Sequence, residues 1–182
     1  MAFAGMILKL KRTPAIFLLG FMGCGKSTVG RLLSDELGWS FFDLDEEIEK
    51  AAGRPISEIF DTLGEAEFRR MESIALRERV SAVLKGRPQV ISLGGGAFTI
   101  AENRHTASEN GVTIWLDTPL NVIEQRIASE THRPLARDRE KMRELYLNRR
   151  ESYAAADYCV ETGDHNAAEI VRLIGQLPIF VP

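Results

Sequence analysis

Short apolar runs alternate with longer amphipathic segments along the chain. The first run, at residues 15–19, is bounded by Pro14 and Gly20 and is typical of a strand covered on both faces. Similar runs predict four further strands, at residues 40–45, 90–93, 112–116 and 158–160. The strand at 40–45 ends in carboxylates.

The segments between these runs place apolar residues at helical spacing. In residues 27–37, Val29, Leu32 and Leu33 share one face, and Gly38 follows as a C-terminal cap. Because strands that alternate with helices favour parallel βαβ units, we predict one α/β domain over residues 1–182, with three αβα layers and a five-stranded parallel sheet. The other predicted helices lie at 44–52, shortly after Pro55, at 65–84, at 119–128, up to 150 and at 166–177.

Composition argues against several classes of function. The formal net charge of −3 and a pI near 5.7 give no general attraction to nucleic acid or anionic membranes. No apolar run approaches the roughly 20 residues that span a bilayer. The two cysteines are too few for a disulfide framework and suit a reducing compartment. We therefore expect a cytoplasmic protein with no nucleic-acid or membrane partner.

Residues 15–28, AIFLLGFMGCGKST, fit two incompatible interpretations. Lys9, Lys11 and Arg12 precede an apolar run that ends at Cys24, as in an export signal with a lipid-attachment cysteine. The same residues fit a buried strand that enters a phosphate-binding loop. An export signal does not predict a strand before the loop and an amphipathic helix after it, so the phosphate loop is favoured, with Cys24 as a small residue within it.

The loop satisfies G-x-x-x-x-G-K-[ST] through Gly20, Gly25, Lys26 and Ser27. Glycines allow a tight turn whose N–H groups face phosphate oxygens, and the helix that follows adds its positive N-terminal end. Lys26 would bring charge to the β- and γ-phosphates, and the Ser27 hydroxyl can bind Mg²⁺. We expect ATP to contact the loop at Gly23, Cys24, Gly25, Lys26, Ser27 and Thr28.

Two aspartates end the second predicted strand, at the sheet edge where ligands of α/β proteins collect. Alternation along a strand would place Asp43 and Asp45 on one side, facing that crevice. Either residue could instead cap the helix that follows. Taken alone the two interpretations are balanced, and the neighbouring phosphate loop favours a functional role.

Three other features give weaker signals. The glycines at 94–96 suggest close approach of a ligand to the backbone, although a flexible turn has the same composition. Helix geometry alone favours a surface ion pair between Arg69 and Glu72. A basic stretch at about 129–139, interrupted by Pro134, is typical of a mobile lid that closes over ATP.

Together these motifs resemble the shikimate kinase family. The resemblance extends from about residue 16 to residue 174, and GEAEFRR together with LGGGA is far more specific than the phosphate loop alone. The matching segments, in family order and spacing, are GFMGCGKSTVGRLL, FFDLDEEIE, GRPISEIF, GEAEFRRME, SLGGGA, RPL and RRESY.

The resemblance implies a nucleoside-monophosphate-kinase type of fold with a lid. It also implies MgATP-dependent phosphorylation of the 3-hydroxyl of shikimate, in aromatic amino-acid biosynthesis, by a protein that we expect to be monomeric. Position by position, it implies catalysis by Lys26, Asp45 and Arg133, nucleotide contacts by Arg126 and Arg133, magnesium binding by Ser27 and, through water, Asp43, and shikimate binding by Asp45, Arg69, Gly95, Gly96 and Arg149.

One region departs from the family pattern. Many members carry a basic residue near the adenine after the last strand, where this chain has residues 163–166, GDHN. The adenine contacts on that side are therefore left open. Two alternatives to shikimate phosphorylation are a kinase for another polyhydroxylated acid, such as gluconate, and a shikimate-kinase-like binding protein without turnover.

Overall fold

The computed structural model describes residues 7–8, 15–128 and 139–181. Five parallel strands form the central sheet in the order β3-β4-β2-β5-β6. The predicted parallel sheet is therefore confirmed. The strands are β2 (Ala15–Leu19), β3 (Ser40–Asp43), β4 (Gln89–Ser92), β5 (Val112–Asp117) and β6 (Tyr158–Glu161).

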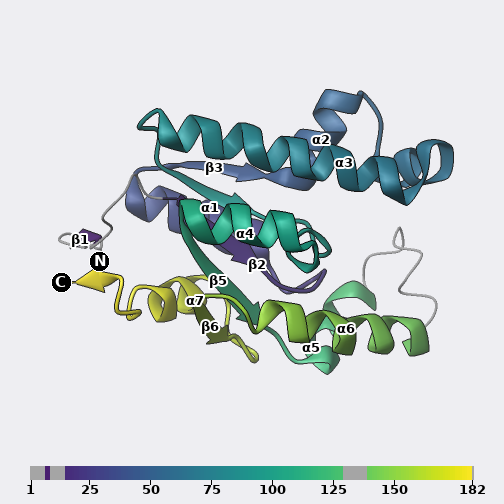
Figure 1. The fold of residues 1–182 in the computed structure, drawn as a ribbon. Helices are drawn as coiled ribbons and strands as arrows, with labels where there is room; N and C mark the ends of the chain where they lie inside the picture. The colour runs from purple at the N-terminus through teal and green to yellow at the C-terminus, as the bar shows by residue number, and fades with distance from the viewer. Residues whose placement is uncertain (1–6, 9–14, 129–138, 182) are drawn as a thin grey trace.

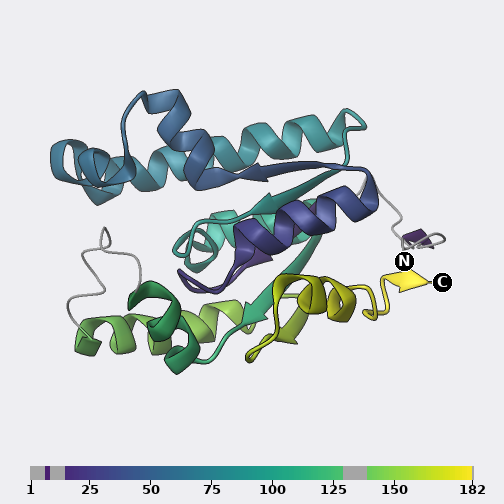
Figure 2. The ribbon, with the colours of Figure 1, turned by 180° about the vertical axis from the view of Figure 1, so that it is seen from behind.

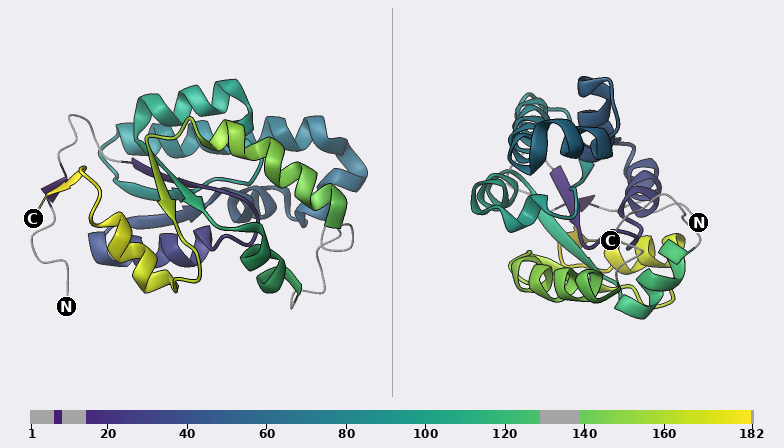
Figure 3. Two further views of the ribbon diagram at one scale, coloured as in Figure 1. Left: turned by 90° about the horizontal axis from the view of Figure 1, so that it is seen from below. Right: turned by 90° about the vertical axis from the view of Figure 1, so that its right-hand side faces the viewer.

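Helices cover both faces of this sheet, which confirms the three-layer architecture (Figures 1 and 3). On one face, residues of β2, β4, β5 and β6 share a core with α1 (Lys26–Leu37) and α7 (Ala167–Ile174). On the other face the core includes side chains of α3 (Ile56–Leu84), α4 (Ala101–Asn110) and α6 (Arg139–Tyr153). The remaining helices are α2 (Leu44–Ala52), the 3₁₀ turn η1 (Ala97–Thr99) and α5 (Leu120–Ala128).

The second strand is shorter than predicted. It ends at Asp43, whose side chain accepts a hydrogen bond of 3.0 Å from the backbone N–H of Asp45 and caps α2. Asp45 therefore lies on a helix, and the argument from strand alternation was wrong for this residue. Asp43 therefore caps the helix and also lies at the sheet edge, two roles that the sequence analysis treated as alternatives.

The two helices predicted after Pro55 form one long element with a break. Gly64 has φ 80° and ψ 168°, a conformation accessible to glycine, and it divides the first turns of α3 from the rest. A small separate core of Ile48, Ile59 and Phe68 packs the first turns against α2. The predicted boundary between the two helices is thus a kink at Gly64 within one helical element.

Helix α4 and the strands at the two ends of the described fold have no counterpart in the sequence prediction. Helix α4 has no apolar stripe, and its buried residues are Asn103 and Ala107. Strands β1 (Ile7–Leu8) and β7 (Phe180–Val181) pair antiparallel at the end of the molecule away from the phosphate loop (Figure 2). No helix in the described ranges is long and apolar enough to cross a membrane.

Candidate active site

The loop between β2 and α1 takes the conformation that the glycine spacing predicted. Gly20, Gly23 and Gly25 all have positive φ, at 145°, 76° and 96°. A Cβ on Gly20 would lie 2.8 Å from the carbonyl oxygen of Leu116 and 2.9 Å from Cys24 Sγ. Because the first of these atoms belongs to the backbone of β5, the loop has no room for a side chain at Gly20.

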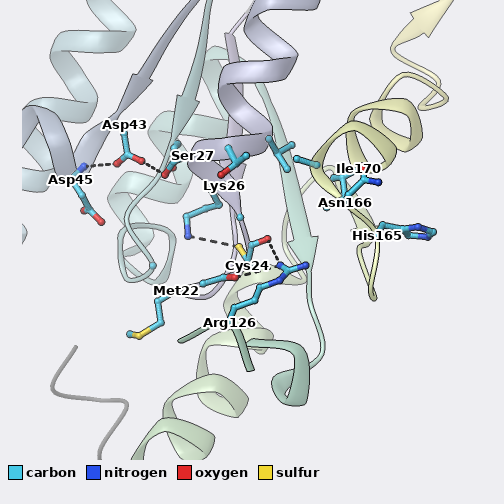
Figure 4. Close-up of a pocket in the computed structure, with 17 residues that line it drawn as sticks. Met22, Cys24, Lys26, Ser27, Asp43, Asp45, Arg126, His165, Asn166 and Ile170 are labelled. Carbon is cyan, nitrogen blue, oxygen red and sulfur yellow. Dashed lines mark hydrogen bonds between the residues drawn. The ribbon is translucent and has the colours of Figure 1, made fainter. Parts of the chain in front are cut away.

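Lys26 extends back across this loop (Figure 4). Its ammonium donates hydrogen bonds to the carbonyl oxygens of Gly20, at 2.9 Å, and Phe21, at 3.2 Å. The lysine charge thus lies where the loop faces the cavity, as expected of a residue that binds a nucleoside triphosphate.

Ser27 and Asp43 face each other at the start of α1. The Ser27 hydroxyl donates to Asp43 Oδ2 over 2.6 Å (Figure 4). In the described part of the chain, no group of three or more His, Cys, Asp or Glu residues could hold a metal by itself. One hydroxyl and one carboxylate suit Mg²⁺, which keeps several waters and takes further ligands from substrate phosphates.

A cavity of about 520 Å³ contains these groups. Beyond the loop it is bounded by Arg126, whose guanidinium lies 3.4 Å from the carbonyl oxygen of Cys24. His165, Asn166 and Ile170 line it at the start of α7, which is the region where the sequence left the adenine contacts open (Figure 4). Asn166 also forms a capping box with Glu169, and this fixes the first turn of α7 against the cavity.

A second cavity of about 650 Å³ adjoins the first. Met22, Asp45 and Gly95 line both, so the two spaces share a wall. The second cavity brings together all five residues that the resemblance assigned to shikimate, which come from α2, α3, α6 and the loop after β4: Asp45, Arg69, Gly95, Gly96 and Arg149.

Arg69 is held by two carboxylates. It pairs with Glu72 at 2.9 Å and with the exposed Glu65 at 3.1 Å. Burial disfavours its charged form, but the two ion pairs outweigh this and raise the pKa of Arg69. The ion pair expected from helix spacing therefore exists, yet it faces the cavity and not solvent.

Burial dominates the other charges of this cavity. It raises the pKa of Asp45, with a further contribution from the Asp43 carboxylate, and it raises the pKa of Glu72 despite the facing Arg69. Burial also lowers the pKa of the Arg149 guanidinium. Glu49 and Asp61 also line the cavity. The charges of Arg69, Arg149, Asp45 and Glu72 are poorly solvated there, and such a site favours a ligand that completes their pairing.

Glu72 is the residue that the sequence argument underrated. Its side chain is 0% exposed, and Oε1 has no hydrogen-bond partner within the described structure. A signal was present in the sequence, because Phe68, Glu72 and Leu76 are four residues apart and share one helix face. A carboxylate in an apolar helical stripe indicates a buried polar site.

The predicted lid falls largely on residues 129–138, which lie outside the described residues. Arg133 is among them. The role of Arg133 and the lid at 129–139 stay predictions.

Comparison with known proteins decides the family. The model of the family described as "Shikimate kinase" matches residues 22–177. The chain belongs to the shikimate kinase family. The shikimate kinase of Persephonella marina is 41% identical over 160 residues, covering 87% of this chain and 95% of that protein. The shikimate kinase of Caulobacter vibrioides is 43% identical over 156 residues, covering 84% and 76%.

Solved structures of shikimate kinases have the same fold. The shikimate kinase from Acinetobacter baumannii in complex with shikimate superposes with a TM-score of 0.82 at 38% identity, covering 90% of this chain and 91% of that one. The resemblance inferred from the sequence motifs is therefore confirmed, together with the fold of this kinase family.

Proposed function

We propose that the protein is a shikimate kinase, which transfers the γ-phosphoryl group of ATP to the 3-hydroxyl of shikimate. The observation that carries this proposal is the shared wall of the two cavities at Met22, Asp45 and Gly95. A phosphate loop on one side and a pair of arginines on the other suit a phosphoryl donor and an anionic acceptor bound side by side.

Arg69 and Arg149 are the proposed clamp for the shikimate carboxylate. Guanidinium groups match a carboxylate geometrically, and each charged hydrogen bond contributes about 1.5–3 kcal/mol. The backbone at Gly95 and Gly96 would complete the acceptor site. The approach is close, because a Cβ on Gly96 would lie 2.5 Å from both terminal nitrogens of Arg69.

Asp45 is proposed to orient the acceptor hydroxyl. In the reaction this oxygen bonds to the γ-phosphorus, the bond from phosphorus to the β–γ bridging oxygen breaks, and ADP leaves. The hydroxyl proton passes to Asp45 or to solvent. Transition states of this kind tend to be loose, so alignment of the hydroxyl matters more than early removal of its proton.

Lys26 is proposed to neutralise charge on the transferred group, with Arg133 from the lid. Ser27 and, through water, Asp43 would hold Mg²⁺, which when bound supplies positive charge to the phosphate oxygens. Arg126 is proposed to lie beside the adenine, since it lines the nucleotide cavity next to the phosphate loop. We also propose that the enzyme acts as a monomer in the cytoplasm.

ADP release with shikimate and with gluconate, measured side by side with MgATP, tests the proposed function. We expect ADP release that depends on shikimate and is absent with gluconate, and a 3-phosphate ester identified by ³¹P NMR. Lys26→Met should abolish the signal and excludes a contaminating kinase. ADP release with gluconate alone would support the other polyhydroxylated acid, and no release with either would indicate a binding protein without turnover.

A further inference from the structure

Tyr153 connects two walls of the acceptor cavity without lining it. It lies at the end of α6, is 1% exposed, and packs its ring against Trp115 with 5.9 Å between ring centroids. Its hydroxyl donates a 2.5 Å hydrogen bond to the carbonyl oxygen of Gly95. The glycine loop after β4 is thereby tied to a helix that follows more than forty residues later.

The same hydroxyl interacts with Arg149, one helical turn earlier. Arg149 lies four residues before Tyr153 on α6, and its charge favours the ionised form of this hydroxyl, whose proton serves Gly95. Arg149 and Gly95 are also close to each other, since a Cβ on Gly95 would lie 3.0 Å from Arg149 Nη1. One hydroxyl therefore lies between two groups that line the proposed site for shikimate.

Anchoring of α6 does not by itself account for this arrangement. Tyr146 on the same helix donates to the carbonyl oxygen of Thr118 over 3.0 Å, and Arg150 makes a two-pronged ion pair with Asp117. These contacts already fix the helix to the end of β5. By contrast, Arg149, which precedes Arg150 on α6 and lines the acceptor cavity, has no carboxylate within ion-pair distance among the described residues.

We propose that the Tyr153 hydroxyl is a positioning group that aims Arg149 at the carboxylate of the acceptor. The inference rests on the proposed function and adds to it a residue that never touches the substrate. Removing the hydroxyl would leave the Arg149 charge in place but free to rotate away from Gly95, so affinity for the acceptor would fall while the transfer step would be largely kept.

Electrostatics supports a hydroxyl that keeps its proton. Burial is the main reason that the pKa of Tyr153 is raised, and Arg149 opposes the shift only in part. The charged and titratable groups nearest this hydroxyl are Arg149 on its own helix, Cys24 in the phosphate loop and Glu72 on α3. The hydroxyl can therefore donate to Gly95 and present a neutral oxygen to Arg149 throughout the pH range in which the enzyme would work.

Tyr153→Phe tests the inference, with Tyr146→Phe as a matched control. Both changes remove one hydroxyl that donates to a backbone carbonyl from a buried ring on α6. We expect Tyr153→Phe to raise the KM for shikimate, and its Kd measured by calorimetry without ATP, about 5- to 10-fold, the effect of one lost buried hydrogen bond. Its kcat and its KM for ATP should stay within about twofold of wild type.

The control separates positioning from stability. Tyr146→Phe should lower the Tm by a similar amount and leave the KM for shikimate within about twofold of wild type. In an Arg149→Ala background, Tyr153→Phe should have no further effect on shikimate affinity, because the two residues would act as one unit.

Two results would overturn the inference. One is equal KM values for shikimate in Tyr153→Phe and Tyr146→Phe. The other is a full additional loss from Tyr153→Phe in the Arg149→Ala background. Either result leaves the proposed function intact if the wild-type enzyme releases ADP with shikimate, whereas a wild-type protein that neither binds nor phosphorylates shikimate overturns both.

Discussion

The two cavities meet at one wall but are built in different ways. The nucleotide cavity depends on backbone geometry, because the loop at residues 20–25 supplies N–H groups through glycines of positive φ and has no space for a side chain at Gly20. The acceptor cavity depends on side chains from separate helices: Glu72 holds Arg69, and we propose that Tyr153 positions Arg149. In the proposed function, the first recognises a chemical group common to all nucleotides, and the second must recognise one small acid.

This difference predicts how each cavity responds to change. Loss of a charge that faces the phosphates should slow the transfer step, since such charges act most strongly in the transition state. Loss of an acceptor contact should weaken substrate binding, since that contact is present before and during transfer.

The largest effect is expected from Arg133→Ala. An arginine that stabilises the transferred phosphoryl group contributes about 10³- to 10⁵-fold to kcat. We expect kcat to fall by that amount, with a modest change in the KM for shikimate. Steady-state kinetics of Arg133→Ala and of the nearby Arg137→Ala would compare the two charges, and similar losses in both variants would contradict a specific role for Arg133.

Arg69→Ala should produce the opposite pattern. Loss of one arm of the carboxylate clamp should raise the KM for shikimate about 10- to 100-fold, the equivalent of one or two charged hydrogen bonds, while kcat changes less. Arg70→Ala is the matched control, because Arg70 is the next residue on α3 and forms an exposed pair with Glu67. A loss confined to kcat in Arg69→Ala would refute the assignment.

The same substitution can be made in the glycine-containing loop of each cavity. An alanine Cβ at Gly96 would displace the end of the Arg69 side chain, so we expect Gly96→Ala to raise the KM for shikimate up to about tenfold with little loss of stability. An alanine at Gly20 would meet the backbone of Leu116 at a φ of 145°. Gly20→Ala should therefore lower the Tm and weaken ATP binding. Thermal melts give the Tm of each variant, and steady-state kinetics give its KM for shikimate and for ATP. Equal changes in Gly96→Ala and Gly20→Ala would contradict the view that one cavity depends on side chains and the other on backbone geometry.

The smallest effect is expected from Glu72→Gln, measured as a pH-dependent stability. Burial raises the pKa of Glu72 above its ordinary value of 4.5, so ionisation of this residue destabilises the fold as pH rises through the raised pKa. Below about pH 4 the side chain at position 72 is neutral in the wild type and in the variant alike. The Tm of the variant relative to wild type should therefore increase between pH 4 and pH 8. A difference that stays constant or reverses would show that Arg69 fully compensates the buried charge.

Sequence patterns predicted the nucleotide cavity better than the acceptor cavity. A contiguous motif defines the phosphate loop, and the local context of strand and helix was enough to choose it over an export signal. For Arg69, helix spacing alone gave a surface ion pair, and only the resemblance to a family assigned Arg69 and Arg149 to a substrate. Spacing cannot show that two helices far apart in the sequence turn these side chains toward one space.

The errors have similar causes. Asp45 was placed on a strand because residues 40–45 continue one apolar run, whereas the cap formed by Asp43 starts the helix earlier. Helix α4 lacks an apolar stripe because it buries few side chains, so periodicity gave no signal for it. The pairing of β1 with β7 joins the two ends of the chain, and pairing of this kind has no local sequence signature.

The place of β2 in the sheet has a consequence for the order of folding. This strand lies between β4 and β5 and not beside β3, its neighbour in sequence. The strand that carries the phosphate loop therefore gains its two partners only after the chain has continued through Asp117. An amino-terminal fragment that ends before β4 contains the whole nucleotide motif, but it lacks both strands that hold the loop in shape. The most local signal in the sequence depends on some of the most distant contacts in the fold.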